Sequence, residues 1–149
     1  MKTIIKKIAL ALLLVFIAIQ FIPTKRNQNK ELLATDFTKV YNVPNNIQNI
    51  LKTSCYDCHS NNTKYPWYNK IQPVSWMLEH HINEAKEEVN FSDFGSYSSK
   101  KQNHKLDEMI DEIKENEMPL FGYKLMHPEA KISKENKKLL LDWLNSKMK

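Results

Sequence analysis

The chain has only two cysteines, Cys55 and Cys58, and a histidine, His59, directly follows the second one. Any fold must bring these three side chains close together, and their spacing suits four kinds of site. A structural disulfide is possible if the protein is exported. A thioredoxin-like redox pair normally lies beside a βαβ pattern, which this sequence lacks. A zinc site would need two further ligands, yet no second CxxC or HxxxH unit occurs.

The fourth arrangement, covalent haem attachment, uses all three residues. In a CxxCH motif the two thiols bond to the haem vinyl groups, and the histidine binds the iron as its proximal ligand. We therefore expect one covalent haem c, held by Cys55 and Cys58, with His59 as the proximal iron ligand.

The first segment differs in composition from the rest. Three lysines precede an apolar run from Ile8 to Ile22, and Pro23 ends it. A positive stretch before a short apolar run is the pattern of an export signal. Because no small-residue cleavage site follows, we expect residues 1–23 to be an uncleaved signal anchor, with a cleaved signal peptide as the alternative. As a helix, Ile4 to Ile22 would measure about 28 Å, close to the thickness of a bilayer core.

This segment predicts a location. The lysines should remain on the cytoplasmic side of a bacterial inner membrane, so that the haem domain faces the periplasm. The whole chain carries a formal charge of +5, but the anchor lysines supply much of it. Since the remaining charges are nearly balanced, we expect no binding to nucleic acid.

The remaining sequence indicates an all-α domain. Only two glycines occur in 149 residues, which disfavours tight β-hairpins because their turns need positive φ angles. We assign residues 24–42 to a linker and residues 43–149 to a small, cytochrome c-like helical domain around the haem.

Helical periodicity divides this domain into segments. A first helix should begin at Pro44, bury Val43, Ile47, Ile50 and Leu51, and lead straight into Cys55. An irregular loop should cover 60–72. A second helix from Pro73 should turn one apolar face inward: Val74, Met77, Leu78, His81, Ile82, Ala85 and Val89. A third should cover about 101–117, bury Leu106, Met109, Ile110 and Ile113, and end at Met118-Pro119. A loop should span 121–131, and a last helix from Ser133 should bury Leu139, Leu140, Trp143 and Leu144.

The second axial ligand of the iron would decide the function. Met118 is the first candidate, because a methionine in a loop after a helix can bring its thioether to the iron opposite His59. The alternative role for a methionine is to fill a gap in the core. His81 is the second candidate, since it lies on the apolar face of its helix, and His127 is the third. His80 and His104 are interpreted as surface residues.

Several motifs, taken in order, are similar to a known family. The run CYDCHSNNTKYPWY from Cys55 to Tyr68 resembles the haem-binding domain family of bacterial c-type cytochrome-like proteins. So do the short motifs at 73–76, 81–84, 90–92, 118–119 and 127–130, and Trp143. The resemblance covers about Val43 to Leu144 and implies haem binding and export. The family often has Gly-Arg where this chain has Ala85-Lys86. The order of motif, Met-Pro loop and final helix is also similar to class I cytochrome c.

The sequence therefore predicts a membrane-anchored monohaem c-type cytochrome. It would transfer single electrons on the periplasmic side, to and from an unidentified redox partner, and would be a carrier rather than an enzyme. The alternative is a haem-based sensor of small ligands, or a peroxidase-like enzyme, with an open or weakly held sixth iron position.

Overall fold

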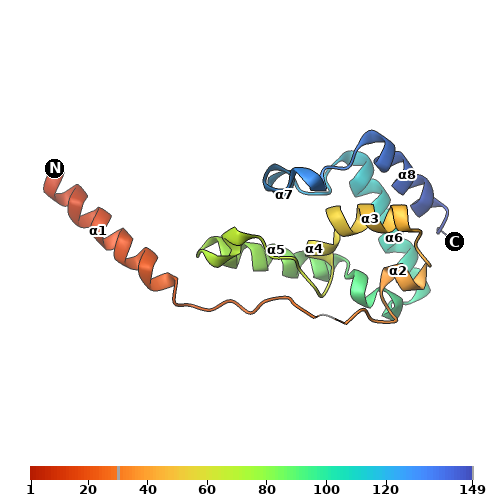
Figure 1. Ribbon diagram of the computed structural model, residues 1–149, viewed down its shortest axis with the longest axis horizontal. Helices are drawn as coiled ribbons and strands as arrows, with labels where there is room; N and C mark the ends of the chain where they lie inside the picture. The colour runs from red at the N-terminus through yellow and green to blue at the C-terminus, as the bar shows by residue number, and fades with distance from the viewer. Residues whose placement is uncertain (30, 149) are drawn as a thin grey trace.

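The computed structural model describes residues 1–29 and 31–148, and the expectation of an all-α fold is confirmed for this part of the chain (Figure 1). The longer helices are α1 (Lys2–Ile19), α3 (Asn45–Ser54), α5 (Val74–Glu88), α6 (Ser99–Glu115) and α8 (Lys134–Asn145). Shorter helical turns connect them: α2 (Phe37–Val40), α4 (Tyr56–His59), η1 (Trp67–Lys70), η2 (Phe91–Ser96), α7 (Phe121–Met126) and η3 (Pro128–Ala130).

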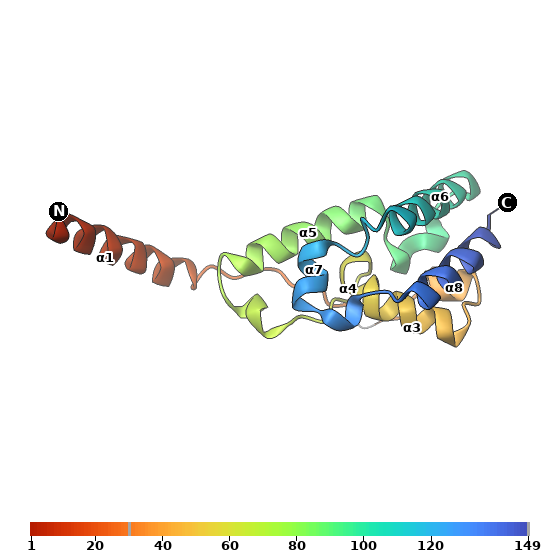
Figure 2. The same cartoon turned by 90° about the horizontal axis from the view of Figure 1, so that it is seen from above.

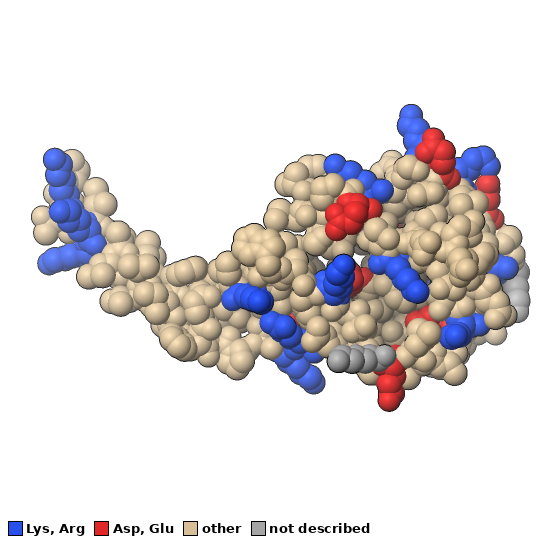
Figure 3. Space-filling view, in the orientation of Figure 1, with Lys and Arg blue, Asp and Glu red and all other residues tan. Residues whose placement is uncertain are grey.

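Helix α1 stands apart from the other helices in both views (Figures 1 and 2), and it has no buried residue. Basic side chains gather at its N-terminal end, whereas both signs of charge mix over the helical domain (Figure 3). Among the described residues, no helix combines the length and the apolar character needed to cross a membrane. The expected membrane anchor over residues 1–23 is therefore not supported by the structure.

The segment after α1 runs along the domain as an extended strap. The Gln72 backbone N–H donates to Gln20 Oε1 over 2.9 Å, and the hydroxyls of Thr24 and Ser75 lie 2.7 Å apart. Further along, Phe37 in α2 is fully buried. Part of the stretch assigned to the linker, residues 24–42, thus contributes directly to the core.

Aromatic rings form the centre of this core. The ring of Phe37 lies 4.8 Å from that of Phe94, 5.3 Å from that of Phe91 and 5.9 Å from that of Trp143. Helices α3, α6 and α8 pack around the cluster, and each buries aliphatic side chains against it: Ile47, Ile50, Leu51, Leu106, Ile110, Ile113, Leu140 and Leu144. The predicted inward faces of the first and third domain helices are confirmed.

Gly95 allows α2 and η2 to approach closely. Its backbone N–H donates to the Thr35 carbonyl over 2.7 Å. A Cβ atom at this position would lie 2.8 Å from Val40 Cγ2 and 2.9 Å from Thr35 Cα. Any larger residue would therefore separate the strap from the core.

The second domain helix differs from its predicted orientation. Pro73 precedes α5 as its N-cap, but the buried residues are Ser75, Glu79 and Ile82. Met77 and His81 are exposed. The predicted apolar face is therefore right at Ile82 and Val89, which are buried, and wrong at Met77 and His81, because α5 packs against the polar strap and loop on one side and lines a cavity on the other.

The C-terminal third contains two further differences. Helix α6 ends at Glu115, where Asn116 adopts a left-handed conformation (φ 64°), so the stop comes before Met118-Pro119. The expected loop over 121–131 contains α7 and η3. Ser133 caps α8 as predicted, and Leu140 and Leu144 are buried, but Leu139 is 40% exposed.

Candidate functional site

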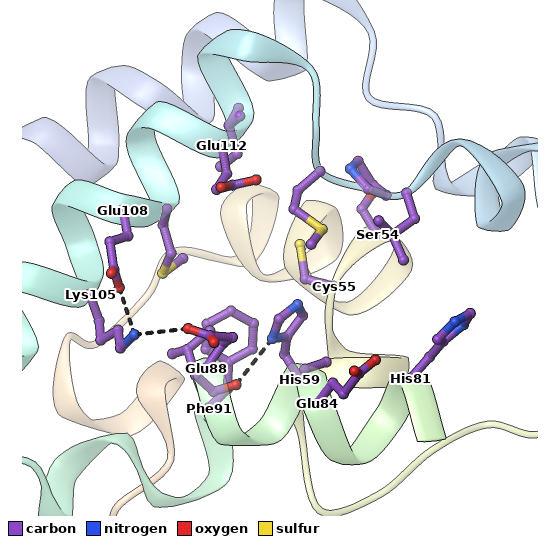
Figure 4. A pocket seen from close by; sticks show the side chains of 17 residues that line it. Ser54, Cys55, His59, His81, Glu84, Glu88, Phe91, Lys105, Glu108 and Glu112 are labelled. Carbon is purple, nitrogen blue, oxygen red and sulfur yellow. Dashed lines mark hydrogen bonds and ion pairs between the residues drawn. The ribbon is translucent and has the colours of Figure 1, made fainter. Parts of the chain in front are cut away.

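A cavity of about 390 Å³ lies between α4, α5, α6 and the segment that follows α6 (Figure 4). Its apolar wall is formed by Ala85, Val89, Phe91, Met109, Ile113 and Leu120. The volume lies within the range of sites that hold organic ligands and cofactors. The cavity also receives residues from the CxxCH segment, so the fold brings the predicted site to a suitable space.

The motif itself forms one turn of helix, α4. The backbone N–H of His59 donates to the Cys55 carbonyl over 3.0 Å. This turn places residues four apart on one face, and both Cys55 and His59 line the cavity. Cys58 lies to one side of that face and is not part of the lining.

The imidazole of His59 is held by the end of α5. Its Nδ1 lies 3.1 Å from the Val89 carbonyl oxygen, which can only accept, so Nδ1 carries the proton. Figure 4 shows the other ring nitrogen pointing into the cavity, on the side of Cys55. Burial lowers the pKa of His59, which keeps the ring neutral. A neutral imidazole with one nitrogen fixed by a carbonyl is the usual form of a metal-binding histidine.

Both cysteines are free thiols. Burial raises the pKa of Cys55 to about 12 and that of Cys58 to about 11. Among the described residues, no group of three or more His, Cys, Asp or Glu side chains is arranged to hold a metal ion. The disulfide and zinc arrangements therefore gain no support from the structure.

Two methionines supply thioethers to the cavity, Met118 and Met109. Met118 was predicted, and it lies half-buried at the start of the segment that crosses from α6 to α7. Met109 was interpreted as packing, and it does pack partly against the core. Met126 is 55% exposed and lies outside the lining, as does Met77.

The structure separates the other histidines. His81 reaches the cavity lining but is exposed, so its expected burial was wrong. His127 lies outside the lining and is bonded to Tyr68, with 2.7 Å between Nε2 and the hydroxyl oxygen. His80 and His104 are exposed, as expected, and each lies 3.2 Å from a glutamate four residues later.

Charged residues around the cavity were missed by sequence reasoning. Four glutamates belong to the lining: Glu84, Glu88, Glu108 and Glu112. Lys105 is the one lysine or arginine in this lining, and its ammonium lies 2.7 Å from Glu108 and 3.4 Å from Glu88 (Figure 4). The hydrogen bond to Glu108 is the largest cause that raises the pKa of Lys105. The only sequence signal was the spacing of Lys105 and Glu108 on one helix face.

The residues present fit a haem. A neutral imidazole and a thioether are the side chains that bind haem iron in electron carriers, and a thiol lies beside the imidazole at the same cavity. Phe91, whose ring centroid lies 5.7 Å from that of His59, provides apolar surface next to the histidine.

Comparisons with known proteins agree with this fit. A family model described as a haem-binding domain matches residues 14–146, which include the whole cavity lining. No curated protein and no solved structure matches the chain. Since the match spans most of the sequence, the chain belongs to the family of haem-binding domains.

Proposed function

We propose that the protein is a c-type cytochrome that carries one covalently attached haem and transfers single electrons. The observation that carries this proposal is the orientation of His59, with Nδ1 bonded to Val89 and the other nitrogen directed into the cavity beside Cys55. A bound haem would supply an iron that changes between ferric and ferrous states by one electron.

Cys55 and Cys58 would hold the group through thioether bonds, and His59 would be the proximal ligand. Cys55 already faces the cavity. Cys58 belongs to the same helical turn, since its backbone N–H donates to the Cys55 carbonyl over 3.2 Å. Haem mass that stays with the chain after denaturation, and is lost when both cysteines are replaced by alanine, would support covalent attachment.

Met118 is proposed as the distal ligand. It lines the cavity together with Pro119 and Leu120, on a segment without regular helix. Met109 is placed on α6 and packs partly into the core, which leaves its sulfur less free to move. His81, although it also reaches the lining, is exposed and forms part of the surface of α5. A thioether opposite an imidazole favours a high reduction potential and a closed iron site.

The apolar wall supports the binding of a haem. Ala85, Val89 and Ile113 line the cavity and offer apolar surface for the macrocycle. We propose further that the domain works after export, because the N-terminal lysines and the apolar run form an export pattern. A redox partner that docks over the haem edge would complete the function.

One set of spectra tests the proposal. The purified full chain should show a low-spin haem spectrum with the long-wavelength sulfur-to-iron charge-transfer band in the oxidised state. Met118→Ala should remove this band and lower the potential. Met126→Ala is the matched control, because Met126 is exposed and does not line the cavity.

Two results would contradict the assignment. Loss of the band in Met109→Leu but not in Met118→Ala would make Met109 the ligand. Rapid carbon monoxide binding to the reduced wild-type protein, at a rate unchanged in Met118→Ala, would favour a sensor or peroxidase-like enzyme with an open site.

A further inference from the structure

Two side-chain hydrogen bonds tie α7 to the CxxCH region. The Tyr123 hydroxyl donates to Asp57 Oδ2 over 2.9 Å. The Tyr68 hydroxyl and His127 Nε2 are 2.7 Å apart. Asp57 lies inside the motif, between the two cysteines, and Tyr68 belongs to η1. Both bonds therefore connect α7 and its C-cap, His127, to the segment that contains and follows the motif.

Tyr123 and His127 also contact each other. They are four residues apart, and their rings stack with centroids separated by 4.4 Å and planes inclined by 24°. His127 Nδ1 lies 3.3 Å from a Glu129 carboxylate oxygen, which can only accept. This contact fits a proton on Nδ1, which leaves Nε2 to accept the Tyr68 O–H. The two hydrogen bonds thus form one connected unit.

Asp57 is well placed to accept from Tyr123. Its second carboxylate oxygen accepts the Lys64 backbone N–H over 3.2 Å, and its carbonyl accepts the Thr63 hydroxyl over 2.6 Å. These contacts fix the carboxylate relative to α4. Burial and the negative charge of Asp57 raise the pKa of Tyr123, so its hydroxyl keeps the proton that it donates.

Without these bonds, α7 would be held weakly. It has six residues and buries none of them, and Phe121 and Leu125 are 78% and 66% exposed. A helix of this length is not stable by itself in water. Met118 lies just before α7 in the chain, so the position of α7 limits the positions that Met118 can take.

We propose that Tyr123 and His127, bonded to Asp57 and Tyr68, form a latch that holds Met118 over the cavity. The latch rests on the proposed function, because it matters only if Met118 is the distal ligand. None of the four residues lines the cavity. Asp57 and Tyr123 are 66 residues apart in the sequence, so the tertiary fold brings them together. They are positioning residues, which act through Met118.

The latch predicts a measurable equilibrium between closed and open states. A hydrogen bond within a protein contributes about 0.5–1.5 kcal/mol, and both latch bonds are partly buried, so removing one should raise the open fraction by about two- to tenfold. Carbon monoxide can bind reduced iron only when Met118 has left, and its apparent rate should increase by the same factor.

The experiment compares Tyr123→Phe and Tyr68→Phe with the wild-type, haem-loaded full chain. Tyr65→Phe is the matched control, because the Tyr65 hydroxyl accepts the Asn27 N–H and does not contact α7. Backbone amide hydrogen exchange in residues 121–127, carbon monoxide association and the sulfur-to-iron band are measured on each. Both latch variants should exchange faster, bind carbon monoxide faster and show a weaker band at elevated temperature, while the control matches the wild type.

Asp57→Asn and Asp57→Ala keep the test decisive if a tyrosine variant does not fold. In the asparagine variant Oδ1 can still accept the Lys64 N–H while the side-chain amide donates to the Tyr123 oxygen, so it should behave like the wild type, whereas the alanine should behave like Tyr123→Phe. Wild-type exchange and binding rates in both tyrosine variants would overturn the latch, as would faster exchange without faster carbon monoxide binding. Failure of the proposed function appears separately, as a band that survives in Met118→Ala.

Discussion

The imidazole Nδ1 of His59 lies 3.1 Å from the backbone carbonyl oxygen of Val89. Val89 is the C-cap of α5 and has extended backbone angles. The last carbonyls of a helix have no partner within it, so the end of α5 provides an acceptor for the ring. Two elements far apart in the sequence thereby fix the tautomer and the direction of one side chain.

This relationship predicts the effect of replacing His59. His59→Ala should abolish the low-spin haem spectrum, because no other described histidine combines burial beside the cavity with a fixed Nδ1 proton. His80→Ala is the control, since His80 is exposed and only pairs with Glu84 over 3.2 Å. Optical spectra of the reduced proteins make the comparison. An unchanged spectrum in His59→Ala would remove it as the proximal ligand.

The close approach at Gly95 leads to a second prediction, on stability. Gly95→Ala should lower the free energy of unfolding by about 1–3 kcal/mol, because the new Cβ would overlap Val40 and Thr35 and force α2 away from η2. Urea unfolding followed by circular dichroism measures this difference. Gly122→Ala is the matched control, since nothing lies within 4 Å of a Cβ there and alanine favours the helix. Equal midpoints for the two variants would contradict the packing argument.

Much of the fold could be predicted because local signals agree with the tertiary structure. Pro44, Pro73 and Ser133 mark helix starts within a residue of where α3, α5 and α8 begin. Periodicity also identified the buried faces of α3 and α6. It was right only in part on α5, where Ile82 is buried as predicted, but polar residues are also buried under the strap and the cavity replaces packed side chains on the other face. It missed α7, whose six residues have no inward stripe to detect.

The site could be predicted only in part. The motif indicated Cys55, Cys58 and His59, and Met118 was selected by its position before Pro119. The Val89 carbonyl carries no residue-specific signal, because every residue has a backbone carbonyl and only the backbone angles decide where it points. Lys105 and its glutamates become significant only when α5 and α6 face each other across the cavity. Tertiary contacts of this kind do not follow from local pattern.

The raised pKa values of the two half-buried cysteines predict slow alkylation in the haem-free chain. Burial raises the pKa of Cys58 from its ordinary value of 9.0 to about 11. The thiolate, which is the reactive form, should therefore be about a hundredfold scarcer at pH 8 than in the unfolded chain. Cys55 should react more slowly still, because its pKa rises to about 12.

Mass spectrometry after timed exposure to iodoacetamide measures both rates, with the urea-unfolded chain as the reference. The rate in the folded chain should increase about tenfold per pH unit, since the pH remains below both raised pKa values. After haem attachment neither cysteine should react, even in urea. Equal rates in the folded and unfolded haem-free chains would contradict the raised pKa values of the thiols.

Lys105 predicts a charge effect on the reduction potential. Its side chain is 12% exposed, and it brings the one lysine ammonium to a cavity lined by four glutamates. A positive charge near the iron favours the ferrous state, so Lys105→Gln should lower the potential by on the order of 30 mV.

Lys101→Gln is the control, because the Lys101 ammonium lies over the Tyr97 ring, away from the cavity. Redox titration of both variants at low and high salt separates the two sites: a partly buried charge is screened less than an exposed one, so more of the shift in Lys105→Gln should persist at high salt. A shift of equal size in Lys101→Gln would indicate a general effect of net charge and would contradict a specific role for Lys105.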